Sequence, residues 1–240
     1  MEVRGIRECQ SCGARFSYYE TGSPACPECG SVYTVGVGDR ELHTDRPADL
    51  DFEKALAALD SGADRDAGQA AAAVARTYVN RRGFVNGGDL RPLDDAYVAA
   101  HEVKHVAALL DRATPRGVGG ETVDREYVSS LLTAASEGDR PPAAAVPESM
   151  HGPRGLGVAD AIRDYHDELK TWLDREGSDR PVSSLLERLD SHVRRLEALD
   201  GGVDPAESER LLVAARRLGA VCSKETDDLD AVEDALGSVR

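Results

Sequence analysis

Apolar residues recur at intervals of three and four along most of the chain from about residue 50 onward. This spacing places them on one face of a helix, and no alternation typical of a half-buried strand appears in this part of the chain. The pattern predicts an all-α bundle region of about eight helices. In chain order, the predicted apolar faces are formed by Phe52, Leu56 and Leu59; Ala73, Val74 and Tyr78; Ala96, Ala100, Val103, Ala107 and Leu110; Val123, Tyr127, Leu131 and Ala135; Val158, Ile162, Tyr165, Leu169 and either Trp172 or Leu173; Leu185, Leu189, Val193, Leu196 and Leu199; Leu211, Ala215 and Leu218; and Leu229, Val232 and Leu236.

Turn-forming residues and charge divide the chain into segments. Residues 1–38 are predicted to form a small β unit, and residues 39–49 lack periodicity, which predicts a tether that lets this unit move independently. Short connections favour antiparallel helices, so residues 50–137 and 158–240 are each predicted to form half of a bundle. The Pro- and Gly-rich residues 138–157 are predicted to be a linker. The two halves can pack as one helical domain or as two.

The strongest chemical signal is a pair of CxxC motifs, Cys9/Cys12 and Cys26/Cys29, each followed by a glycine. A CxxC turn points two thiolates to the same side, so two such turns close four sulfurs around one tetrahedral zinc ion. All metal positions are then filled by protein, and none is open for catalysis. Structural zinc supplies about 10–16 kcal/mol to small domains, which a segment this short needs in order to fold. We therefore predict one structural zinc ion in a zinc ribbon.

Other interpretations of the same cysteines stand beside zinc. A pair of disulfides is one, but the fifth cysteine, Cys222, is left unpaired and no signal peptide is recognised, which favours zinc. Iron fits the same sulfurs less often. Cys222 itself is expected to be a small core residue. Between and after the motifs, residues 14–20 and 31–35 are predicted to be strands.

The stretch ECQSCGARFSYYETGSPACPECGSVYTVGV, at residues 8–37, resembles the zinc ribbon of the transcription initiation factor B type. The resemblance covers about the first 38 of the 240 residues. The joining of such a ribbon to an acidic, Ala- and Asp-rich helical region is similar to uncharacterised zinc-ribbon proteins of haloarchaea. The resemblance implies a ligand role for the four cysteines and no activity, because zinc ribbons serve transcription, translation and assembly alike.

The chain is strongly acidic, with 44 Asp and Glu residues against 29 Lys and Arg and a net charge of −15. Such a surface keeps a protein soluble when salt screens repulsion, as in a halophile, and mimicry of nucleic acid is the alternative. No apolar run approaches the roughly 20 residues that span a bilayer. We therefore expect a soluble, cytoplasmic protein with no membrane partner.

One enzyme-like motif, HEVKH at residues 101–105, satisfies the HExxH pattern of zinc metalloproteases, in which the Glu is the general base. Such a site needs a third ligand, for which Glu121 and Glu126 are the candidates. On a helix projection at about 100° per residue, His101 and His105 lie nearly opposite the apolar face. We expect an exposed His pair and no catalytic residue, because the lysine within the motif also departs from the protease pattern.

Three classes of function are compatible with these signals. The first is a non-enzymatic adaptor whose ribbon or helical surface docks on a protein or nucleoprotein partner, such as the transcription or translation machinery. The second is a nucleic-acid-binding regulator that uses ribbon arginines for phosphates and ribbon aromatics for stacking on bases. Its candidate residues are Arg4, Arg7, Arg15, Phe16, Tyr18, Tyr19 and Tyr33. The third is a zinc metallohydrolase using HEVKH.

Charge favours the adaptor over the nucleic-acid binder. Up to residue 35 the ribbon has three arginines against four glutamates. A zinc ion bound by four thiolates adds two further negative charges, whereas surfaces that bind phosphate are normally positive. A protein partner is therefore the expected one.

Overall fold

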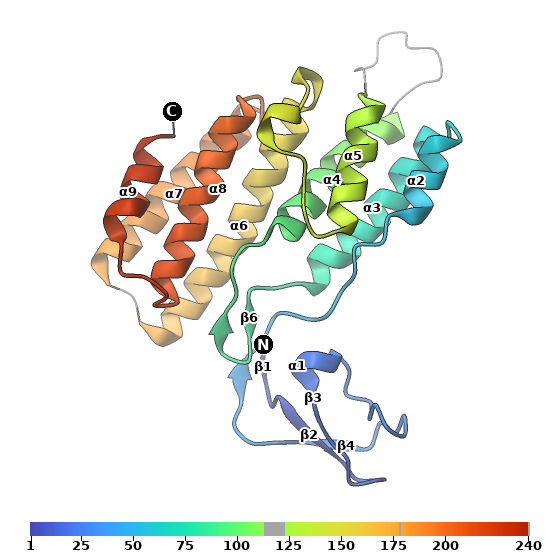
Figure 1. The fold of residues 1–240 in the computed structure, drawn as a ribbon. Coiled ribbons are helices and arrows are strands. Elements are labelled where there is room, and N and C mark those ends of the chain that lie inside the picture. The colour runs from blue at the N-terminus through green and yellow to red at the C-terminus, as the bar shows by residue number, and fades with distance from the viewer. Residues whose placement is uncertain (113–122, 178, 240) are drawn as a thin grey trace.

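The structure, a computed structural model, describes residues 1–112, 123–177 and 179–239. A small N-terminal β unit, blue in Figure 1, is followed by a layer of helices that lie side by side. The predicted fold class is confirmed. In the described part of the chain, the helices after residue 50 are α2 (Glu53–Asp60), α3 (Asp64–Arg81), α4 (Asp95–Arg112), α5 (Arg125–Ser136), α6 (His151–Glu176), α7 (Arg180–Ala198), α8 (Pro205–Cys222) and α9 (Leu229–Gly237), with short 3-10 turns at Ala143–Ala145 and Glu148–Met150.

The N-terminal unit is built on a three-stranded antiparallel sheet in the order β3-β2-β4. Its strands are β2 (Ile6–Cys9), β3 (Arg15–Ser17) and β4 (Thr34–Val37). The strand predicted at 14–20 ends early, because Ser17 accepts a hydrogen bond from the Glu20 N–H and starts the short helix α1 (Tyr18–Thr21). The strand predicted at 31–35 begins later and continues further, since it pairs along the whole of β2.

Residues 39–49, predicted to be a tether, instead pack between the ribbon and the helices. Strand β1 pairs antiparallel with β5, and β6 pairs with β7 in a hairpin. The bounds are β1 (Glu2–Val3), β5 (Glu41–Leu42), β6 (Val85–Asn86) and β7 (Asp89–Leu90). The His43 N–H donates to the Met1 O (2.9 Å) and the Thr44 N–H to the Val85 O (2.8 Å). Backbone hydrogen bonds of this kind do not require a periodic pattern of apolar side chains. The sequence therefore suggested a free tether.

One hydrophobic core runs through both helical halves. Helix α4 lies near the centre of the layer, packed against α3 on one side and α6 on the other. The halves 50–137 and 158–240 therefore share their core, which the sequence left open. Most predicted inward residues are buried, but Ala73 and Leu199 are exposed. In α3 this happens because alanines lie on several sides of the helix, so that spacing alone does not select the buried face.

The Pro- and Gly-rich segment 138–157, predicted to be a linker, contains the first turns of α6. Pro153 lies in the first turn, where a backbone N–H has no carbonyl partner within the helix. A proline, which lacks this N–H, is therefore tolerated there. Two glycines are packing residues. A Cβ at Gly157 would lie 2.6 Å from the Cα of Glu102, and one at Gly155 would lie 2.2 Å from a backbone oxygen of the turn between α7 and α8. These glycines let α6 approach its neighbours closely and are not a sign of flexibility.

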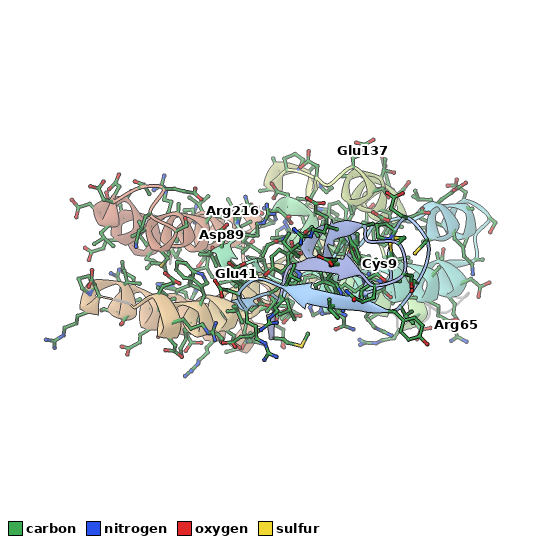
Figure 2. All side chains as sticks on the ribbon, turned by 90° about the horizontal axis from the view of Figure 1, so that it is seen from below. Cys9, Glu41, Arg65, Asp89, Glu137 and Arg216 are labelled. Atoms are coloured by element: carbon green, nitrogen blue, oxygen red, sulfur yellow. The ribbon has the colours of Figure 1, made fainter. Side chains whose placement is uncertain are left out.

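The ribbon lies below the helical layer in Figure 1. Seen from below in Figure 2, its sheet lies across the middle of that layer, and the helices extend to either side. The short strands β5, β6 and β7 lie where the two parts meet. In the ranges that the structure describes, no helix has the length and apolar character needed to cross a membrane.

Candidate functional site

The four predicted metal ligands are carried by two ribbon turns with the same backbone structure. In the first turn the Gly13 N–H donates to the Cys9 O, and in the second the Gly30 N–H donates to the Cys26 O, both at 2.9 Å. The two glycines have φ values of 77° and 71°, a left-handed conformation that glycine adopts without steric cost. The repeated CxxCG sequence therefore builds two matched turns that present their cysteines to one point.

The four sulfurs lie together in the ribbon, on which Figure 2 labels Cys9. The Sγ atoms of Cys9 and Cys29 are 3.7 Å apart, as are those of Cys12 and Cys26, and all four lie within 4.8 Å of one another. These distances exclude disulfides, which need about 2.05 Å. A tetrahedral site with Zn–S bonds of about 2.3 Å has sulfur–sulfur edges of roughly 3.8 Å. The group can therefore hold a metal ion, and its geometry is consistent with zinc.

The pKa values of the thiols reflect backbone hydrogen bonds within the turns and the crowding of the four sulfurs. The pKa of Cys9 is lowered to about 6, chiefly by a backbone hydrogen bond from Cys12. A backbone hydrogen bond from Ala14 acts to lower the pKa of Cys12, but the sulfurs of Cys29 and Cys9 outweigh it and raise this pKa to about 12. Neighbouring thiolates repel, so four of them ionise together only around a cation. A bound metal ion meets that requirement.

The HExxH motif lies on α4, and its histidines are not exposed as expected. His101 is 2% exposed, His105 is half-buried, and both face α6. The His105 Nε2 lies 2.9 Å from the Asp160 Oδ2, and the His101 Nε2 lies 3.1 Å from the Asp164 Oδ2. The expectation was wrong because the projection allowed α4 one packed face, whereas α6 covers a second one.

Glu102, the general base that the motif would require, is fully buried and engaged elsewhere. Its Oε2 accepts a hydrogen bond from the Arg154 Nη1 at 2.6 Å, and its Oε1 accepts one from the Tyr127 hydroxyl. Of the two candidates for a third ligand, Glu126 is exposed on α5 and Glu121 lies outside the described residues. Within the described residues, the four cysteines are the only group of three or more His, Cys, Asp or Glu side chains placed to share a metal ion.

The candidate residues for nucleic-acid contact are partly occupied within the ribbon. Arg7 donates two hydrogen bonds to Thr34, at 2.9 and 3.0 Å. Arg15 forms an ion pair with Glu8 at 2.9 Å. Tyr33, by contrast, is 74% exposed. Arg4, which is exposed, donates to the Gly36 O at 3.3 Å. Each of the three arginines thus has a partner within the ribbon, whereas Tyr33 is open to solvent.

The structure also buries charges that the sequence did not single out. Arg154 donates to Glu102 and also, from its Nη2, to the Glu209 Oε1 at 2.9 Å. Arg140 pairs with the same Glu209 and, at 2.6 Å, with Asp95. This network joins α4, α6 and α8 through the segment before α6. No spacing of residues in the sequence predicts this network, because its members come from elements that are distant in the sequence.

A family model described as a family of unknown function (DUF7117) matches residues 1–237 of the chain. The match runs through the ribbon, the cysteine group and the helical layer. No curated protein and no solved structure matches the chain.

Proposed function

The chain belongs to a family of unknown function, DUF7117, and we propose that this member is a zinc-binding, non-enzymatic adaptor. Its ribbon binds one structural zinc ion through Cys9, Cys12, Cys26 and Cys29 and docks on a protein partner. The resemblance to ribbons of the transcription initiation factor B type favours a partner from the transcription or translation machinery.

The observation that carries this proposal is the position of the exposed apolar side chains. Of seven strongly exposed large apolar residues in the described chain, five lie within the first 35 residues. Four of them form what we call the ribbon face: Ile6 (48% exposed), Val32 (70%), Tyr33 (74%) and Val35 (46%). In a chain with a net charge of −15, such a gathering on one small unit favours an interaction surface.

Strand register and the metal site give the ribbon face a fixed shape. Ile6 lies opposite Val37 and Glu8 opposite Val35, so the apolar side chains of β2 and β4 stand on the same side of the sheet. The other two ribbon-face residues follow the second cysteine turn, whose position the metal ion fixes. A preorganised surface with an aromatic anchor loses little conformational entropy on binding a partner.

The charges of this surface support a protein partner over nucleic acid. Arg7 is bonded to Thr34, and Arg15 is paired with Glu8. With zinc bound by four thiolates, the ribbon carries more negative than positive charge. A nucleic-acid site would need arginines that are free to neutralise phosphates.

The contacts of the HEVKH motif on α4 favour a structural role for its side chains. His105 hydrogen-bonds to Asp160 of α6, and the His101 Nε2 lies 3.1 Å from the Asp164 Oδ2 of the same helix. Glu102 bonds to Arg154 of α6 and to Tyr127 of α5. A metalloprotease needs the two imidazoles and the carboxylate to meet at one metal-bound water. We therefore assign no catalytic residue.

Photo-crosslinking tests the adaptor role. A photoreactive amino acid is placed at position 33 of the full chain, and crosslinking is carried out in native, high-salt lysate. We expect a discrete crosslinked polypeptide that survives nuclease treatment, because the ribbon face contacts protein.

The matched control places the same group at position 213, since Val213 is also apolar and is 41% exposed but lies on α8. This position is expected to give no such product. Crosslinks to nucleic acid alone, or the same polypeptide from both positions, would contradict docking through the ribbon face.

A further inference from the structure

The ribbon joins the helical layer through a continuous stack of short segments. Strand β5 pairs with β1, and the Gly88 N–H of the β6–β7 hairpin donates to the Leu42 O at 2.9 Å. From α6, the Trp172 Nε1 donates to the Gly88 O at 2.7 Å. The Thr44 hydroxyl donates to the Glu168 Oε2 at 2.6 Å, also on α6. We call these contacts the junction; its strands lie between the ribbon and the helices in Figure 1.

His43 is buried in this junction without a hydrogen-bond partner for its side chain. It is 4% exposed, and neither its Nδ1 nor its Nε2 has a partner. Its ring lies 4.4 Å, between centroids, from the ring of Tyr19 and meets Tyr18 edge-on at 5.9 Å. Both tyrosines belong to α1 of the ribbon. An imidazole in such a place is tolerated while it is neutral, because a buried charge without a partner is costly.

We propose that His43 makes the junction pH-sensitive, so that it is closed while the imidazole is neutral and opens when the imidazole is protonated. Opening moves the ring away from Tyr18 and Tyr19, hydrates it, and frees the ribbon to move relative to the helical layer. The proposal goes beyond the adaptor function and does not depend on the identity of any partner.

The surrounding charges do not offer an imidazolium a free partner. Burial lowers the pKa of His43 below 6.5; Asp45 opposes this effect, whereas the N-terminal ammonium and Arg46 add to it. Asp45 is already paired with Arg82 at 2.7 Å. Glu168 accepts hydrogen bonds from Thr44 and from the Phe84 N–H. The charged groups of the junction strands and of α1 are Glu2, Glu20, Glu41 and Asp89, and those that act on His43 or bond to Thr44 and Asp45 are Asp45, Arg46, Arg82, Glu168 and the N-terminal ammonium.

The direction of the pH effect follows from this lowered pKa. A proton binds more tightly to His43 in the open state, where its pKa is the ordinary value of about 6.5. Above that pH the closed junction has its full stability. Below it, the ratio of closed to open molecules falls, by at most about tenfold per pH unit, until the pH reaches the pKa of the closed state.

Fluorescence of Trp172, the one tryptophan of the chain, reports on the junction through its bond to Gly88. In the zinc-loaded full chain we expect its emission to shift to the red as the pH falls from about 8 to about 5.5, a range that brackets the titration of histidine. The midpoint should lie below about 6.5. In His43→Phe the emission should stay constant, because a phenyl ring fills the same space without titrating. His151→Gln removes a histidine at the start of α6 and should keep the shift.

NMR titration of the His43 ring in the unmodified chain gives its pKa even if the variant folds poorly. A His43 pKa below about 6.5 that coincides with the emission midpoint supports the proposal. A pKa at or above that value, or an emission shift that persists in His43→Phe, would overturn it. So would a shift that follows zinc release, measured in parallel with a chromogenic indicator.

Discussion

At the scale of residues, the buried charges between α4 and α6 constrain how the two helices pack against each other. The side chains of Glu102 and Arg154 are each 1% exposed and bond to each other at 2.6 Å. Tyr127 and Glu209 satisfy further atoms of the pair. A buried ion pair contributes little net stability, but the loss of one partner leaves an uncompensated charge. We interpret the pair as a contact that favours one orientation of α6 on α4.

Arg154→Met tests this interpretation, since it removes the positive charge at similar volume and leaves Glu102 buried. We expect the free energy of unfolding in urea to fall by about 3–5 kcal/mol. Arg194→Met is the matched control, because Arg194 is 76% exposed and pairs with Asp190 on the surface of α7. It should cost less than about 1 kcal/mol. Equal losses in the two variants would show that the buried pair has no special role.

At the scale of elements, the sequence predicted what is local and missed what depends on distant segments. Helical spacing located α2 to α9 because each helix buries its own stripe of apolar residues. The CxxCG repeats predicted the cysteine group for the same reason, since each turn is encoded within five residues. The second packed face of α4, the environment of His43 and the backbone pairing of residues 39–49 all arise from partners far along the chain. Periodicity contains no information on them.

The start of α6 is the clearest case of a misleading composition. A run rich in Gly and Pro predicted a linker, yet Gly155 and Gly157 lie where a side chain would strike neighbouring backbone. Composition shows that a segment contains glycine, but it does not show whether the glycine serves flexibility or close packing. In α6 the reason is close packing against α4 and against the turn between α7 and α8.

Gly155→Ala should therefore destabilise the protein, although alanine favours helices. Its Cβ would lie 2.2 Å from a backbone oxygen, and displacing that backbone should cost about 1–3 kcal/mol in thermal or urea unfolding. Gly237→Ala in α9 is the control, since a Cβ there meets nothing within 4 Å. We expect the control to be neutral or stabilising by up to about 1 kcal/mol. A stabilised Gly155→Ala variant would mean that the contact with the α7–α8 turn is loose.

At the scale of the whole molecule, the two parts are held together by different means. In the described residues the hydrophobic core begins at Leu42 and extends through the helical layer. The ribbon buries few side chains besides Cys9 and Cys26, so we expect a metal ion held by the four cysteines to take the place of a core there. The acidic surface belongs mainly to the helical part, and its dependence on salt stays a prediction. The fold of the ribbon, and with it the proposed docking surface, therefore depends on one claim, that the four cysteines bind a zinc ion.

Elemental analysis of purified chains tests that claim most directly. We expect one zinc ion per chain in the natural sequence and in the control Cys222→Ser, because Cys222 is buried in the helical core, where burial raises its pKa to about 11. In the Cys12→Ser, Cys29→Ser double variant, which keeps two of the four ligands, zinc should be essentially absent. Zinc that stays stoichiometric in the double variant and is lost on His101→Ala would contradict the ribbon site and transfer the metal to α4.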